Sequence, residues 1–330
     1  MQIRLPHLFA IACVLTISVT AAPAQSTVWG LQSSDRFSVK TTIDRETIIQ
    51  LADRDPVTST SQEELELEYL VWRISPTETM MQVNVLSFVR IDSSGDTVTD
   101  SMLDQRLKLL ERVPIIIAVA PDGVVKNLSG YRESLKQFAG PDRKMLQLLE
   151  EAWPRQSFES WVGRPFWMTP PADDVEDRET WERIDQLSLG LIGGLRTVAT
   201  CHIDSKAENS AKVLVSGSTR LIRPSPSDDD ASTRSVRFTG VETTAESFTG
   251  EGLLLLPENV VDDDSRPGRL RPWFASLVLN WSVTGEARVE SGGQSQKVTF
   301  EHRQEQSHQL QPDFRMGRPP ALPGLPQPKR

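Results

Sequence analysis

The chain has 330 residues and a formal net charge of −9 at pH 7. A protein this acidic lacks the basic footprint that nucleic acid requires, and it does not dock on anionic lipid through charge alone. We therefore expect no nucleic-acid partner.

The first 24 residues have the three parts of a cleavable secretory signal. Arg4 gives a positive start, an apolar run follows over 8–19, and Ala22-Pro23-Ala24 supplies small residues for cleavage. Removal of Arg4 with the signal takes the net charge from −9 to −10. The sequence therefore predicts an exported protein, periplasmic or extracellular, whose mature chain begins near Gln25.

Two alternatives to a cleaved signal are a retained membrane anchor and a lipoprotein signal. The apolar run is shorter than the roughly 20 residues of a spanning helix, and no basic stop-transfer cluster follows it. The run also stays apolar after Cys13, where a lipoprotein would turn polar. Nothing downstream is apolar enough to span a bilayer, so we expect no transmembrane segment after cleavage.

Residues 25–128 have the pattern of half-buried strands. Apolar residues alternate with polar ones over 37–43, 65–71 and 81–85. The short break Ser75-Pro76-Thr77 predicts that the second and third strands pair as an antiparallel hairpin. A second hairpin is expected around Pro121-Asp122-Gly123, and 92–96 reads as a further turn.

Residues 129–154 change to helical spacing. Tyr131, Leu135 and Phe138 lie on one helix face, and a second apolar stripe runs from Met145 to Trp153 before Pro154. Such a stripe usually packs on a sheet, although it can also form the wall of a ligand site.

Residues 155–311 return to strands, and 312–330 form a proline-rich tail that we expect to be extended and disordered. Strands are predicted over 181–189, 195–203, 211–222, 235–241, 248–256, 274–289 and 296–304. The predicted fold class is α+β, mainly antiparallel β, with one or two large curved sheets and a helical insertion at about 131–153. Whether the two β-rich blocks form one domain or two stays open.

The layout of the chain resembles an uncharacterised family of secreted, β-rich bacterial proteins, a domain of unknown function. The likeness rests on short segments over 27–311: 31–37, a strand with Trp72, Pro121–Val125, a strand opened by Trp181, and Asn280–Gly285. The resemblance implies an exported β-rich envelope protein. It implies no activity and no site residues.

Cysteine and histidine do not form a recognisable site. Cys13 leaves with the signal, so Cys201 is a lone thiol without a disulfide partner. Cys201 and His202 are adjacent on a predicted strand and point to opposite faces. A thiol hydrolase or a zinc site would need His302 or His308 brought to them. We interpret the set as one buried thiol beside exposed imidazoles.

The sequence also lacks clear motifs for calcium binding, hydrolysis or phosphate binding. The loops 228–230 and 262–264 hold three aspartates each but lack the spacing of an EF-hand, and we interpret them as solvated. No nucleophile elbow and no phosphate-binding glycine loop occurs. We predict no catalytic, metal or cofactor-binding residues, no cofactor, and no enzyme activity.

Aromatic and apolar residues are the remaining candidates for ligand contact. Tryptophans serve sugar- and lipid-binding surfaces when exposed, although burial in a core is their commoner fate. The candidates are Tyr131, Phe138, Leu149, Trp161 and Trp167.

Three functions follow from these observations. The first is a non-catalytic envelope or surface module that binds a protein or has a structural role. The second is a periplasmic carrier of a lipid or another hydrophobic small molecule, because a curved sheet under a helical lid makes an apolar concavity. The third is a hydrolase with dispersed catalytic residues.

Overall fold

A computed structural model describes residues 31, 33–51, 54–92, 114–143, 145–146, 150, 155–170, 180–189, 192–222, 237–255, 273–291 and 294–311. The predicted signal, both aspartate-rich loops, the predicted turn over 92–96 except Asp92, and the tail from 312 lie outside these residues. So does Leu149.

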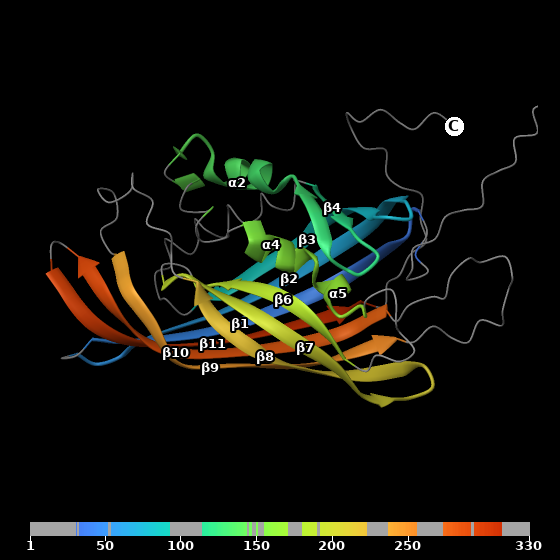
Figure 1. Ribbon diagram of the computed structural model, residues 1–330. Helices are drawn as coiled ribbons and strands as arrows, with labels where there is room; N and C mark the ends of the chain where they lie inside the picture. Colours follow the sequence, from blue (N-terminus) through green and yellow to red (C-terminus); the bar gives the residue numbers. More distant parts are fainter. Residues whose placement is uncertain are drawn as a thin grey trace, which may run out of the picture.

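Eleven strands form one antiparallel sheet (Figure 1). Their order is β5-β4-β3-β2-β1-β11-β10-β9-β8-β7-β6. The strands are β1 (Arg36–Leu51), β2 (Val57–Ile74), β3 (Thr79–Asp92), β4 (Ile115–Val119), β5 (Val125–Ser129), β6 (Thr180–Ser188), β7 (Gly194–Lys206), β8 (Ser210–Ile222), β9 (Arg237–Leu255), β10 (Trp273–Ser291) and β11 (Gln294–Leu310).

The predicted fold class is confirmed, and the two β-rich blocks belong to a single sheet. Their junction is the antiparallel pairing of β1 with β11, from Val39 opposite Leu310 to Leu51 opposite Val298. Both predicted hairpins are present, β2–β3 and β4–β5. The strands expected over 235–241 and 248–256 are one strand, β9. Its polar middle also pairs with β10, and shifts of register accommodate it there.

The helices are α2 (Tyr131–Ala139), α4 (Arg155–Val162) and α5 (Arg164–Trp167). The first was predicted; the other two fall in a stretch that was assigned to the second β-rich block. Pro165 is in the first turn of α5, where its missing N–H costs nothing. The helical insertion therefore continues to Trp167.

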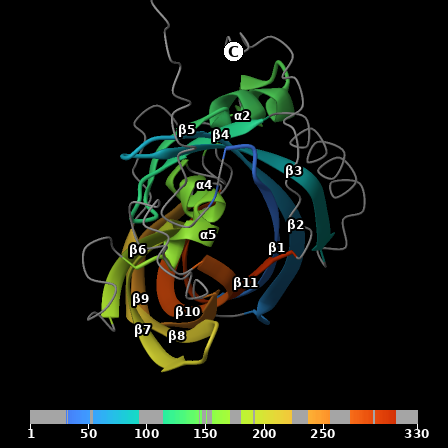
Figure 2. The same ribbon diagram turned by 90° about the vertical axis from the view of Figure 1, so that its right-hand side faces the viewer.

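The sheet curves around α4 and α5, which lie on its concave side, while α2 lies beside β4 and β5 (Figure 2). We call the concave side the inner face and the opposite side the outer face. Along β1, the residues from Phe37 to Ile43 alternate between buried inner positions and more exposed outer ones. Inner and outer residues alternate in this way because successive side chains of a strand point to opposite faces.

The two edge strands, β5 and β6, are not paired with each other. The α4 helix contacts both of them. Arg155 donates from Nη2 to the Leu128 carbonyl oxygen on β5, at 3.2 Å. From β6, Arg183 donates to the carbonyl oxygens of Asp122, Trp167 and Thr169. The segment 155–169 thus covers sheet edges that would otherwise be free to pair with other chains.

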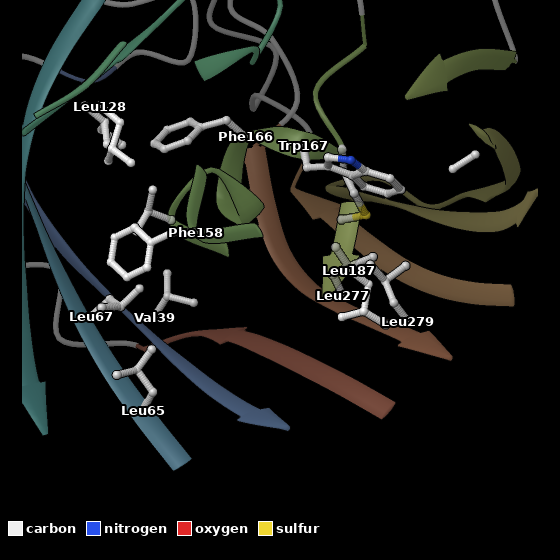
Figure 3. Packing of buried hydrophobic residues seen from close by; sticks show 14 of the residues in the cluster. Val39, Leu65, Leu67, Leu128, Phe158, Phe166, Trp167, Leu187, Leu277 and Leu279 are labelled. Atoms are coloured by element: carbon white, nitrogen blue, oxygen red, sulfur yellow. The ribbon is translucent and has the colours of Figure 1, made fainter. Parts of the chain in front are cut away.

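Aromatic residues connect α5 to the middle of the core. Phe37 and Tyr69 stack with ring centroids 4.7 Å apart, and Phe166 meets both rings edge-on. The Tyr69 hydroxyl donates to the Val162 carbonyl oxygen at 2.9 Å. Figure 3 shows the helical residues Phe158, Phe166 and Trp167 in one cluster with side chains of the strands.

Gly123, in the β4–β5 turn, allows α5 to approach this turn. Its φ is +86°, and a Cβ there would collide with the Phe166 carbonyl oxygen. Gly240 also has a positive φ, +57°, but a Cβ there would meet nothing within 4 Å. We expect Gly123→Ala to lower the free energy of unfolding by at least about 1 kcal/mol more than Gly240→Ala. Urea denaturation measures both; equal losses would show that the turn and α5 do not pack closely.

Candidate functional site

The inner face of β11 carries a stripe of buried polar side chains. It consists of His302, Gln304, Gln306 and His308, each at most 5 % exposed. On either side lie the inner residues of β1 and β10, which include Ile43, Leu277 and Leu279. We call the four residues the inner polar stripe.

Two histidines of the stripe bond to threonines of β1. Thr47 Oγ1 is 2.9 Å from Nδ1 of His302, and Thr41 Oγ1 is 3.0 Å from Nδ1 of His308. The interpretation of both imidazoles as exposed is therefore wrong. The sequence misled because the outer face of β11 is polar as well, so β11 shows no hydrophobic alternation there.

Burial keeps both histidines neutral. It lowers the pKa of His302 to about 4, with a further decrease from the Arg45 charge and a partial offset from the neighbouring Gln304 side chain. Burial also places the pKa of His308 well below the usual value, and the charge of Arg164 adds to this effect. A neutral imidazole has one N–H donor and one acceptor nitrogen, so each can offer one hydrogen bond beyond that to threonine.

A buried ion pair lies over the stripe. Arg164 of α5 donates from Nη2 to both carboxylate oxygens of Asp185 on β6, at 2.9 and 3.1 Å, and more weakly to Oε1 of Gln306 at 3.4 Å. The guanidinium carbon lies 5.5 Å from the ring centroid of Trp167 and 6.0 Å from that of Trp281. The two side chains are 3 % and 1 % exposed, so neither charge is solvated.

A second ion pair adjoins the stripe from β1 and β2. Arg45 donates from Nη1 to Oε1 of Glu63 at 2.6 Å, and from Nε to Oε1 of Gln304 at 3.1 Å. Each arginine is thus matched by one carboxylate. With both histidines neutral, the charges of these two pairs sum to zero, one pair buried and the other partly exposed.

Several buried polar atoms at this place have no hydrogen-bond partner among the residues that the structure describes. They are Nε and Nη1 of Arg164, Nε2 of Gln304, and Nε2 of both His302 and His308. A buried donor without a partner costs about 1–3 kcal/mol, so natural proteins rarely leave several together. The cluster can therefore donate hydrogen bonds to an acceptor-bearing molecule in apolar surroundings.

Cys201 and His202 behave as the sequence predicts, but they do not meet the other histidines. Cys201 is buried and His202 is exposed, and burial raises the thiol pKa to about 12. β7, which holds both, is four strand positions from β11, roughly 19 Å along the sheet. Among the residues that the structure describes, no three His, Cys, Asp or Glu side chains are grouped to hold a metal ion.

The predicted ligand-contacting residues separate into two places. Tyr131 and Trp161 both contact the Phe158 ring, at centroid distances of 5.4 and 5.3 Å. Trp167 is buried beside Arg164. The side chain of Phe138 lies outside the described part. The inner polar stripe was missed altogether, since only tertiary pairing brings β1 beside β11.

The outer face has a groove of about 680 Å³ across the middle of the sheet. Two rows of polar residues, in register across β2, β1, β11, β10 and β9, form most of it. The rows are Gln62, Asp44, Glu305, Asn280 and Thr249, and Thr60, Glu46, Arg303, Ser282 and Ser247. This groove lies behind Arg45 and Gln304, on the opposite face of the same strands.

We expect Arg164→Met to lower the free energy of unfolding by about 3–5 kcal/mol, because it leaves Asp185 buried without a partner. The double variant Arg164→Met/Asp185→Leu removes both charges and should regain most of this loss in urea denaturation. Lys40→Met, which removes the exposed pair with Glu64, is the control and should cost less than about 1 kcal/mol. Equal losses in the single and double variants would contradict this account of the pair.

The histidines predict a dependence of stability on pH. Because the pKa of His302 is lowered in the folded protein, the unfolded chain binds more protons between about pH 6.5 and 4, and stability falls as the pH falls through this window. From pH 7 to 5, His302 alone should cost about 2 kcal/mol. Unfolding measured across this range should therefore vary less with pH in His302→Gln/His308→Gln than in the native protein. The exposed control His202→Gln should match the native slope; a double variant that matches it too would contradict the prediction.

No helix among the described residues has the length and apolar character needed to cross a membrane. A scan against models of known protein families finds no match, and a search of curated proteins finds none either.

Solved structures resemble the chain in architecture. Lipovitellin, in a structure titled for its lipid–protein interactions, matches 88% of this chain at 8% identity and a TM-score of 0.43. This chain spans only 26% of the lipovitellin chain. An outer membrane channel from Pseudomonas putida F1 matches over 86% of this chain and 97% of its own, at 10% identity and a TM-score of 0.26. The outer membrane protein OprG from Pseudomonas aeruginosa matches over 84% of this chain and 95% of its own, at 6% identity and a TM-score of 0.21. These are likenesses between β-sheet proteins and assign no family.

Proposed function

We propose that this chain is an exported, non-catalytic binding protein that holds an amphiphilic molecule against the inner face of its sheet. The observation that carries the proposal is a buried apolar face that contains hydrogen-bond donors without partners. An apolar chain would lie along the face, and the donors would take the polar end. Among the functions considered from the sequence, this is the carrier of a hydrophobic ligand.

The inner face is much longer than the two helices that lie on it. A strand such as β10, with 19 residues, extends about 60 Å, whereas the eight residues of α4 extend about 12 Å. Beyond the stripe, toward the β10–β11 turn, several apolar residues are only partly buried although they pack on the core: Ile49, Leu51, Phe238 and Val289. Phe88 of β3 is also partly buried, at the level of Thr41. These residues would contact the apolar chain of the ligand.

Entry would require the helical segment to move from the inner face. The edges β5 and β6 are connected through this segment and through Arg183 rather than through strand pairing. Displacing α4 and α5 would therefore open the concave side without breaking the sheet. Such covering segments are common in sites that must admit and release a ligand.

Export is part of the proposal and rests on the signal-like residues 1–24. A periplasmic or extracellular location would bring the protein to membrane lipids and to apolar molecules outside the cell. Membership of the exported β-rich family that the sequence resembles stays a prediction.

The outer groove supports a second candidate, binding of a polar molecule such as a sugar chain or a peptide segment. Its rows offer both donors and acceptors, including three carboxylates and the guanidinium of Arg303, which pairs with Glu46 at 3.3 Å. This candidate corresponds to the envelope or surface module considered from the sequence.

Native mass spectrometry with lipid extraction, on the protein purified after export, tests the proposal. We expect a bound apolar or amphiphilic adduct. Phe88→Asp puts a charge on the inner face and should abolish the adduct. Val89→Asp is the matched control: Val89 is the next residue of β3, 50% exposed on the outer face, and the adduct should persist.

If Phe88→Asp does not fold, Ile49→Asn on β1 provides a milder change at a second partly buried position of the inner face. A clean mass without adduct, before and after incubation with extracted lipid, would overturn the carrier. A polar adduct that survives Phe88→Asp but is lost with Asn280→Leu would favour the groove instead.

A further inference from the structure

The inner polar stripe can distinguish between classes of amphiphile. Free fatty acids and acidic phospholipids carry an ionised head group, whereas glycerides and other esters are neutral but rich in carbonyl and hydroxyl oxygens. The balanced charges of the site disfavour an ionised head group, and its unpartnered donors favour a neutral head group with oxygen acceptors.

The charges are already balanced before any ligand arrives. Asp185 takes two hydrogen bonds from Arg164, and Glu63 pairs with Arg45. Both histidines are neutral because burial lowers their pKa values. An ionised head group would therefore add a buried charge that no free countercharge matches, which is unfavourable in apolar surroundings.

The donors, in contrast, are in excess. Gln304 uses its amide oxygen for Arg45 and leaves Nε2 free, and Arg164 uses Nη2 and leaves Nε and Nη1 free. Gln306, between Gln304 and His308 on the same face of β11, touches Arg164. Alternate residues of a strand are roughly 7 Å apart, so these groups border one small region. Carbonyl and hydroxyl oxygens of a neutral head group can accept from such donors without bringing charge.

We propose that Arg164 and Gln304, with His308 beside them, form a binding site for the ester carbonyl or hydroxyl oxygens of a neutral acyl lipid. The inference rests on the proposed function and specifies the class of amphiphile that the protein would bind. Trp167 and Trp281, whose rings approach the Arg164 guanidinium, form the apolar border of the site. The acyl chain would run from there along the inner face.

Competition binding with two ligands of the same acyl chain, monooleoylglycerol and oleate, tests the site at pH 8. We expect monooleoylglycerol to bind at least about tenfold more tightly than oleate. In Gln304→Met, which keeps the length of the side chain but removes the free N–H, this ratio should fall by about tenfold. Gln309→Met, on the outer face of the same strand, is the matched control and should keep the ratio.

The outcomes separate this inference from the proposed function. Equal or tighter binding of oleate would overturn the neutral-lipid site and leave an amphiphile carrier standing. No binding of either ligand would overturn both. If Gln304→Met fails to fold, Arg164→Met/Asp185→Leu serves as the second variant. An unchanged ratio of the two affinities in a folded variant would show that these donors do not distinguish between the two head groups.

Discussion

A curved sheet of eleven strands that does not close on itself must have its concave apolar face and its two edges covered. In this chain one segment, residues 155–167, contributes to both, because α4 contacts the two edge strands while α5 packs against the middle of the inner face. Arginines hold it there: Arg183 donates to the Trp167 carbonyl oxygen, and Arg164 pairs with Asp185. Removing this segment would expose backbone groups and apolar surface together.

The same arrangement brings polar groups into the core. Arg164 reaches the inner polar stripe of β11, where two neutral histidines and two glutamines lie between apolar neighbours. A core that served stability alone would gain from apolar residues at these positions, since buried charges and unpartnered donors are costly. Their presence is the observation from which we propose a ligand whose polar end would complete the hydrogen bonding.

Much of the fold could be predicted from the sequence, since period-two alternation marks β1, β2 and β3, and short turns mark the hairpins. The helices over 155–167 were not predicted, because α4 has only eight residues and α5 only four, and Gly163-Arg164-Pro165 interrupts the pattern between them. The site could not be predicted either. His302 and His308 are on a strand with two polar faces, and only the pairing of β11 with β1 and β10 makes one face interior. Arg164 and Asp185 are 21 residues apart in different elements.

A crystal structure of the protein purified after export tests the central claim most directly. The account predicts continuous electron density along the inner face, with acceptor atoms within hydrogen-bond distance of Arg164 and Gln304 and an apolar chain near Phe88 and Ile49. An inner face filled only by protein side chains, with ordered water on the free donors, would contradict it.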